Sequence, residues 1–186
     1  MTRRILIVYG TAYGHTAKIA SRLERALVRD GLNVAVMCAD TTLHIDLAEF
    51  DGVIVGSSII RGKHRPSIDQ FVTEHRQALN TLPTAFFSVS GAAASADPGE
   101  RYEAQRMLQS FLTKHSWNPD LIATFGGAIS YTRYSPIVRF FMKRISRKEG
   151  GPTDTTRDHE LTDWARVDDF AEHFARVAAP VLFAGK

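Results

Sequence analysis

The chain has 186 residues, 44% of them hydrophobic and 23% charged, with a formal net charge of +3. These proportions are ordinary for a globular protein and suit one domain spanning residues 1–186. No apolar run reaches the roughly 18 residues of a membrane-spanning helix, so we expect none. The only cysteine, Cys38, can form no internal disulfide and gives no metal site, so we expect no metal. The positive charge leaves nucleic acid, an anionic membrane or an anionic substrate open as partners.

The N-terminus is basic and then apolar, as in a secretion signal. Its apolar run ends at Gly10, however, and no small-residue cleavage site follows. Residues 3–9 therefore read as a buried first strand, and we expect the protein to stay in the cytoplasm.

Apolar periodicity divides the chain into alternating strands and helices. Short runs rich in Val, Ile and Phe predict strands buried on both faces at residues 3–9, 33–38, 51–56, 83–89 and 121–129. Apolar residues at helical spacing predict helices at 16–29, 66–79, 99–114 and 164–177. This order predicts an α/β fold with a five-stranded parallel sheet and helices on both faces. Such sheets bind ligands at the carboxyl ends of their strands.

A loop of small and hydroxyl-bearing residues joins the first strand to the first helix. It consists of Thr11, Ala12, Tyr13, Gly14, His15 and Thr16. Its backbone N–H groups, the helix N-terminus and the threonine hydroxyls can all face an anion. Because it lacks the lysine of nucleoside-triphosphate loops and the GxGxxG spacing of dinucleotide folds, the monophosphate of FMN fits better. The alternative is an ordinary turn in which Thr16 only caps the helix.

Two further loops leave the same edge of the predicted sheet. One follows the third strand and contains Ser58, Ile59, Ile60, Arg61 and Gly62; the other follows the fourth and contains Ser88, Val89, Ser90, Gly91, Ala92 and Ala93. Small residues in such loops let the backbone approach a planar ligand. We therefore expect both loops to flank a flavin ring, the alternative being two ordinary polar turns.

Cations in the first of these loops bear on redox chemistry. Reduced FMN tends to carry negative charge near N1, so a nearby cation stabilises the reduced state. On this basis we assign catalytic roles to Arg61, as the stabilising cation, and to His64, as the nearest candidate for a general base. The alternative for His64 is a loop histidine with no catalytic role. The cations favour a two-electron acceptor over a single-electron carrier, which usually surrounds its flavin with acidic residues.

A long insertion, residues 130–163, separates the fifth strand from the last helix. Its residues 137–148 form a basic amphipathic helix, with an apolar face made by Ile137, Val138, Phe141, Met142 and Ile145. Such a helix suits the surface of an anionic bilayer. It can instead pack its apolar face on the sheet, or bind nucleic acid, but no nucleic-acid-binding module surrounds it and we expect no nucleic acid as a partner.

Taken together, the chain resembles the flavodoxin-like, quinone-dependent protoporphyrinogen oxidases of bacteria. The resemblance runs from the loop at residues 11–16, which we call the phosphate loop, to the last helix. It is carried mainly by residues 56–64 and 85–89, SWNPD at 116–120, GAISYTRY at 127–134, GGPTDT at 150–155 and TDW at 162–164. It implies a flavodoxin-like fold, FMN as cofactor, and a peripheral position on the inner face of the cell membrane. The implied reaction oxidises protoporphyrinogen IX to protoporphyrin IX and passes the electrons to a membrane quinone.

The implied substrate carries two propionates, which the insertion has cations to bind. Arg133, Arg139 and Lys143 are the candidates for this clamp, because a guanidinium matches the geometry of a carboxylate. Three other functions stay open: a flavodoxin-like NAD(P)H:quinone reductase, a non-enzymatic FMN electron carrier, and a binding module that has lost its flavin.

Overall fold

The computed structural model describes residues 3–41, 44–129, 131–133, 135–148 and 151–179, without the side chains of Phe141, Met142, Ile145 and Lys148. Its main sheet has five parallel strands in the order β2-β1-β3-β5-β6. Their bounds are Arg4–Gly10 for β1, Asn33–Cys38 for β2, Gly52–Ile60 for β3, Thr84–Ser90 for β5 and Leu121–Gly126 for β6. The predicted five-stranded parallel sheet is confirmed.

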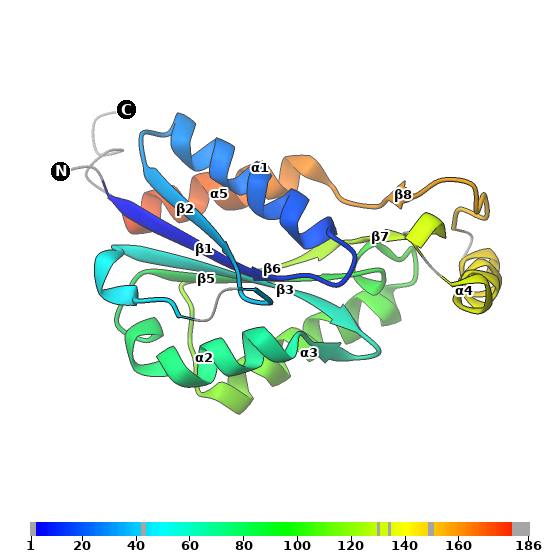
Figure 1. The fold of residues 1–186 in the computed structure, drawn as a ribbon, viewed down its shortest axis with the longest axis horizontal. Helices are drawn as coiled ribbons and strands as arrows, with labels where there is room; N and C mark the ends of the chain where they lie inside the picture. Colours follow the sequence, from blue (N-terminus) through cyan, green and yellow to red (C-terminus); the bar gives the residue numbers. More distant parts are fainter. Residues whose placement is uncertain (1–2, 42–43, 130, 134, 149–150, 180–186) are drawn as a thin grey trace.

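Helices cover both faces of this sheet (Figure 1). Helices α1 (His15–Arg29) and α5 (Trp164–Ala178) pack on one face around Ile7, Leu23 and Phe174. Helices α2 (Pro66–Leu79) and α3 (Pro98–His115) pack on the other around Val55 and Phe86. Because both faces are covered, the strands are mainly apolar rather than alternating, with buried serines such as Ser57 and Ser88 toward their carboxyl ends.

The direction in which strands are added reverses between β1 and β3. The chain passes from β1 outward to β2, and then crosses back to β3 on the other side of β1. The connections that leave the carboxyl ends of β1 and β3 therefore diverge to opposite faces of the sheet, which is where open parallel sheets bind ligands.

The third strand is longer than the predicted 51–56. Ile59 and Ile60 pair antiparallel with a short strand, β4 (Lys63–His64), so part of the predicted loop is strand. The turn between them is Arg61–Gly62, with φ of 51° and 75°. Two successive positive φ angles are typical of the two-residue hairpin turn that matches strand twist.

The fifth strand is shorter than the predicted 121–129. It leaves the sheet after Gly126, and Ala128–Ile129 forms β7, which pairs antiparallel with β8 (His159–Glu160). The returning insertion lies against this point, since a Cβ at Gly126 would stand 2.3 Å from the carbonyl oxygen of Leu161. Pairing with the insertion therefore replaces pairing with the main sheet.

The insertion contains η3 (Tyr131–Arg133) and α4 (Pro136–Lys148), and α4 lies beyond the carboxyl ends of the strands (Figure 1). Two further 3-10 turns are η1 (Leu47–Glu49) and η2 (Ala92–Ala94). Ser130, Tyr134 and Gly150, which belong to the motifs of the sequence resemblance, lie outside the described residues. Among the helices that the structure describes, none has the length and apolar character needed to cross a membrane.

We expect Gly56→Ala to destabilise the fold. A Cβ at this position in β3 would stand 2.1 Å from Cζ of Phe87, whose ring is fully buried, so the ring or the strand must move. Overpacking of this kind costs about 1–3 kcal/mol, which urea unfolding will measure. The matched control is Gly91→Ala, where φ is −63° and a Cβ meets nothing within 4 Å. Equal unfolding free energies for the two variants would contradict this packing.

Candidate functional site

A cavity of about 310 Å³ opens at the carboxyl ends of the strands, and we call it the strand-end cavity. Three predicted loops contribute to its wall through Thr11, Ala12, Tyr13, His15, Thr16, Ser58, Ile59, Ile60, Arg61, Val89, Ser90 and Gly91. The structure thus brings most of the predicted cofactor residues to one place, although they come from three separate crossovers of the chain.

The phosphate loop is ordered around Thr11 and Gly14. The N–H of Gly14 donates to Oγ1 of Thr11 at 3.0 Å, and Gly14 has a φ of 86° as it enters α1. No side chain caps α1. The first turn therefore keeps backbone N–H groups directed out of the helix end, where they can bind an anion.

Two hydroxyls in the cavity wall lack hydrogen-bond partners. Oγ1 of Thr16 and Oγ of Ser58 are buried, with 1% and 8% of the two residues exposed, and no described residue bonds to either atom. An unsatisfied buried hydroxyl costs on the order of 1–3 kcal/mol. A phosphate-bearing ligand at the α1 N-terminus would offset that cost, so the residues present fit a flavin nucleotide.

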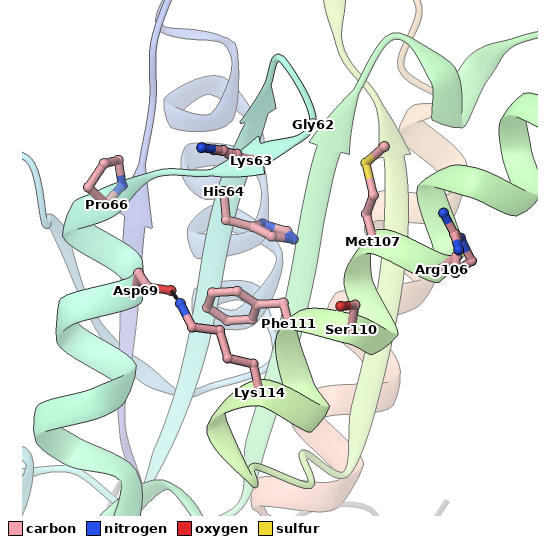
Figure 2. A pocket seen from close by; sticks show the side chains of 10 residues that line it. All are labelled: Gly62, Lys63, His64, Pro66, Asp69, Arg106, Met107, Ser110, Phe111 and Lys114. Carbon is pink, nitrogen blue, oxygen red and sulfur yellow. Dashed lines mark hydrogen bonds and ion pairs between the residues drawn. The ribbon is translucent and has the colours of Figure 1, made fainter.

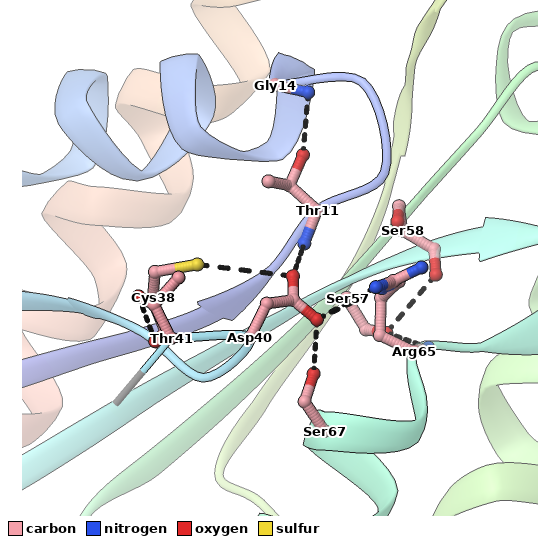
Figure 3. A network of polar contacts seen from close by, with 9 residues as sticks. All are labelled: Thr11, Gly14, Cys38, Asp40, Thr41, Ser57, Ser58, Arg65 and Ser67. Carbon is pink, nitrogen blue, oxygen red and sulfur yellow. Dashed lines mark hydrogen bonds and ion pairs between the residues drawn. The ribbon is translucent and has the colours of Figure 1, made fainter. Parts of the chain in front are cut away.

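Asp40, just after β2, ties the start of the phosphate loop to α2 (Figure 3). Its carboxylate accepts hydrogen bonds from the N–H of Thr11 at 2.8 Å, from Nη2 of Arg65 at 2.9 Å and from the hydroxyl of Ser67 at 2.8 Å. Position 10 must be glycine here, because a Cβ would stand 2.8 Å from Ile68 and 2.9 Å from Arg65. The loop therefore leaves β1 against the first turn of α2.

Arg61 stands at the tip of the β3–β4 hairpin and lines the strand-end cavity. It is exposed, and its φ of 51° puts a residue that is not glycine in the left-handed region of backbone conformation. Positive φ is uncommon outside Gly, Asn and Asp, and non-glycine residues with it concentrate at functional sites. Arg61 therefore lies in the wall of the strand-end cavity, and its contact with a cofactor stays a prediction.

His64 lies in a different cavity (Figure 2). This second cavity, of about 590 Å³, lies between α2 and α3 and is lined by Gly62, Lys63, His64, Pro66, Asp69, Arg106, Met107, Ser110, Phe111 and Lys114. The ring centroid of His64 is 4.5 Å from that of Phe111 and 5.5 Å from that of Phe86. Arg61 stands in the hairpin turn, whereas His64 ends β4 just before α2, so closeness to Arg61 in sequence did not bring His64 into the strand-end cavity.

Burial makes His64 a poor general base at the flavin. It lowers the pKa of His64 to about 4, with the backbone of Met107 opposing the shift weakly, and neither ring nitrogen meets a described hydrogen-bond partner of good geometry. Gly62 also faces this second cavity rather than the strand-end cavity.

The remaining predicted cofactor residues lie around the strand-end cavity without lining it. Gly14 is the N-cap of α1, and Ser88 is buried within β5 with a hydroxyl that no described residue satisfies. Ala92 and Ala93 form η2, where Ala93 is buried. These residues shape the loops that carry the lining.

His15 lines the cavity and is tied to the end of the insertion. Its Nε2 lies 2.5 Å from Oγ1 of Thr162, whose hydroxyl proton is directed to the carbonyl of Gly126 at 2.7 Å. Nε2 must therefore be the donor, which assigns the proton of the neutral ring. Burial lowers the pKa of His15, and the nearby Glu160 opposes this.

The three cations predicted to bind substrate occupy different positions. Arg133 donates from Nη1 to the carbonyl of Tyr13 in the phosphate loop. Arg139 and Lys143 are half-buried on α4, one helical turn apart. None of the three lines the strand-end cavity, but Val138, beside Arg139, does.

Four cavity residues were not predicted: Gly127, Ala128, Ile129 and Val138. The signal for the first three was the Gly126–Gly127 pair, since adjacent glycines interrupt a strand and open space for a ligand. Val138 carried no such signal, because its role depends on where the insertion folds back.

Comparison with known proteins agrees with this geometry. A family model described as "Flavodoxin domain" matches residues 6–156. A curated relative from Escherichia coli strain K12, named protoporphyrinogen IX dehydrogenase [quinone], is 33% identical over 94% of this chain and 96% of its own length. A relative of the same name from Leishmania major is 32% identical over 96% of this chain and 77% of its own.

Among solved structures, oxidised flavodoxin 1 from Bacillus cereus superposes with a TM-score of 0.57. The alignment covers 93% of this chain and 97% of that one, at 15% identity. At that identity the likeness shows a shared fold.

We expect His64 to make stability depend on pH between about 4 and 6.5. The pKa of His64 is about 4 in the folded protein, against 6.5 for an ordinary histidine, so in this window the unfolded chain binds the additional proton. The unfolding free energy should therefore rise with pH across the window, by on the order of 3 kcal/mol from His64 alone. Urea unfolding at several pH values measures this slope.

The variant His64→Phe keeps an aromatic ring against Phe86 and Phe111 but removes the titration. Its profile should be flatter than that of the parent between pH 4 and 6.5. Parallel profiles would show that His64 is not held neutral by burial.

Proposed function

The chain belongs to the flavodoxin-domain family and, within it, to the quinone-linked protoporphyrinogen IX dehydrogenases, and from this membership we propose that it uses FMN to oxidise protoporphyrinogen IX. It is an oxidoreductase with a flavodoxin-like fold. A membrane quinone would receive the electrons. One observation supports the proposal above the others: the buried, unpartnered hydroxyls of Thr16 and Ser58 face one cavity at the N-terminus of α1.

The cavity wall divides into a phosphate end and a ring end. Residues 11–16 would surround the FMN phosphate, which the hydroxyl of Thr16 and backbone N–H groups after Thr11 would bind. Residues 58–61, 89–91 and 127–129 would flank the ring. When bound, FMN supplies the capacity to accept two electrons.

Arg61 would stabilise charge that develops on the ring side of the cavity. It lines the wall from the hairpin tip, and its guanidinium brings a positive charge to the cavity. His64 takes no part in this proposal, because it faces the second cavity and is neutral there. Protons from the substrate would pass to water at the mouth of the strand-end cavity.

Helix α4 would bind the propionates of the substrate. Arg139 and Lys143 are four residues apart and lie on the same side of the helix. Val138 brings this part of α4 to the cavity wall. We therefore propose Arg139 and Lys143 of α4 as the clamp, while Arg133 of η3 bonds to the carbonyl of Tyr13.

The outward face of α4 would contact the anionic inner surface of the cell membrane. Ile137 and Phe140 are 71% and 65% exposed, and Arg144 and Arg147 are exposed on the same side of the helix. Exposed apolar residues beside cations suit the boundary of headgroups and acyl chains, where each cation contributes about 1 kcal/mol. A quinone dissolved in that membrane would then be close to the cavity.

We expect anaerobic mixing of the FMN-loaded protein with protoporphyrinogen IX to bleach the flavin absorbance while porphyrin fluorescence rises. Because the conversion removes six electrons and each FMN accepts two, one porphyrin should form for every three flavins reduced. Added quinone should restore the absorbance. Arg61→Asn removes the charge but tolerates positive φ, so it should bind FMN normally and bleach about tenfold more slowly, as for a loss on the order of 1–2 kcal/mol.

The control is reduction by dithionite, which shows that the flavin can be bleached. No bleaching by protoporphyrinogen IX after a positive control would reject this substrate. Bleaching by NADH or NADPH instead would favour a quinone reductase, and transfer of single electrons without substrate oxidation would favour a carrier.

We expect the protein to sediment with vesicles that contain phosphatidylglycerol and much less with neutral vesicles. Ile137→Ser should weaken this binding several-fold, because it removes an exposed apolar side chain from the outward face of α4. The control is Val28→Ser, since Val28 is 52% exposed at the end of α1, far from α4 (Figure 1). Equal loss in both variants, or none in either, would contradict a membrane contact through α4.

A further inference from the structure

One side chain of the insertion, that of Arg133, bonds to the backbone of the phosphate loop. Nη1 of Arg133 donates to the carbonyl of Tyr13, 120 residues earlier in the chain. The same atom stands 3.0 Å from the place a Cβ would take at Gly14. Arg133 therefore lies directly against the bend of the loop, on the turn η3 that precedes α4.

The contact fixes the peptide group between Tyr13 and Gly14 at both ends. Its carbonyl accepts from Arg133, and its N–H donates to Oγ1 of Thr11 at 3.0 Å. Gly14, with φ of 86°, is the most easily rotated residue of the loop. Rotation of this peptide would turn a carbonyl dipole toward an anion at the α1 N-terminus, and the two hydrogen bonds oppose that rotation.

The contact also supplies the loop with a positive charge. Residues 10–16 contain no lysine or arginine. Of the neighbouring cations, Lys18 pairs with Glu160, and the guanidinium of Arg65 pairs with Asp40, which accepts from the N–H of Thr11. Arg133 is near Asp158, which accepts from the N–H and hydroxyl of Thr132, but it bonds to the loop itself.

We propose that Arg133 is a positioning residue for the phosphate of FMN. It holds the Tyr13–Gly14 peptide in its orientation and places the positive charge of its guanidinium behind the loop. This rests on the proposed function only in taking FMN as the ligand. The insertion thereby contributes to cofactor affinity as well as to substrate contact. Arg133 is thus assigned to the cofactor site rather than to the propionates of the substrate.

The test compares FMN with riboflavin, which has the same ring and no phosphate. Dissociation constants of both flavins are measured by fluorescence quenching for the parent, Arg133→Gln and Arg133→Lys. Arg133→Gln should weaken FMN binding about 10- to 100-fold, as expected for a lost charge-assisted hydrogen bond, and change riboflavin binding less than twofold. Arg133→Lys, which keeps the charge but loses the planar fork, should fall between parent and Arg133→Gln for FMN.

The matched control is Arg157→Gln, an arginine of the same insertion that is exposed and pairs with Asp154. It removes the same charge without touching the loop and should leave both flavins unaffected. Unchanged FMN affinity in Arg133→Gln, or equal loss of FMN and riboflavin, would overturn the proposal while leaving the FMN-dependent function in place. A parent protein that binds neither flavin would overturn both.

Discussion

The strand-end cavity depends on one carboxylate, that of Asp40, which joins the start of the phosphate loop to the start of α2. Asp40 accepts hydrogen bonds from the first N–H of the phosphate loop and from two side chains at the start of α2. It thereby joins the segments that leave β1 and β2 to the helix that follows β4. Burial alone would raise the pKa of Asp40, but the bonds from Thr11, Ser67 and Arg65 lower it, so the group stays charged and these bonds persist at neutral pH.

A fixed negative charge beside an anion site needs compensation. Arg65 provides it within the same cluster, with Nη2 2.9 Å from the carboxylate of Asp40. Because the N–H of Thr11 already bonds to Asp40, binding of a phosphate falls to the later groups of the loop. The hydroxyl of Thr16, buried and unsatisfied, is one of these, and the orientation of the Tyr13–Gly14 peptide governs the others.

Local patterns predicted the elements and the loops, while long-range contacts decided the details. The sheet and the residues at 11–16 followed from apolar runs and from one short motif, which need no tertiary information. The end of β6 at Gly126 depends on the backbone at Leu161, and the position of Val138 depends on the path of the insertion. The misplacement of His64 arose because closeness in sequence was used, whereas its position depends on packing against Phe111, which lies far along the chain.

The β7–β8 ribbon brings the two ends of the insertion together. Ala128 pairs with Glu160, and Ile129 pairs with His159, so the intervening segment leaves and rejoins the fold at one point. Closing a loop between fixed ends costs only about 0.6 kcal/mol more for each doubling of its length. The segment is thus a module in the evolutionary sense: it can lengthen, shorten or change its sequence while the sheet and its apolar layers stay as they are. Changes in the segment between β7 and β8 can therefore adapt the enzyme to new substrates without altering the sheet.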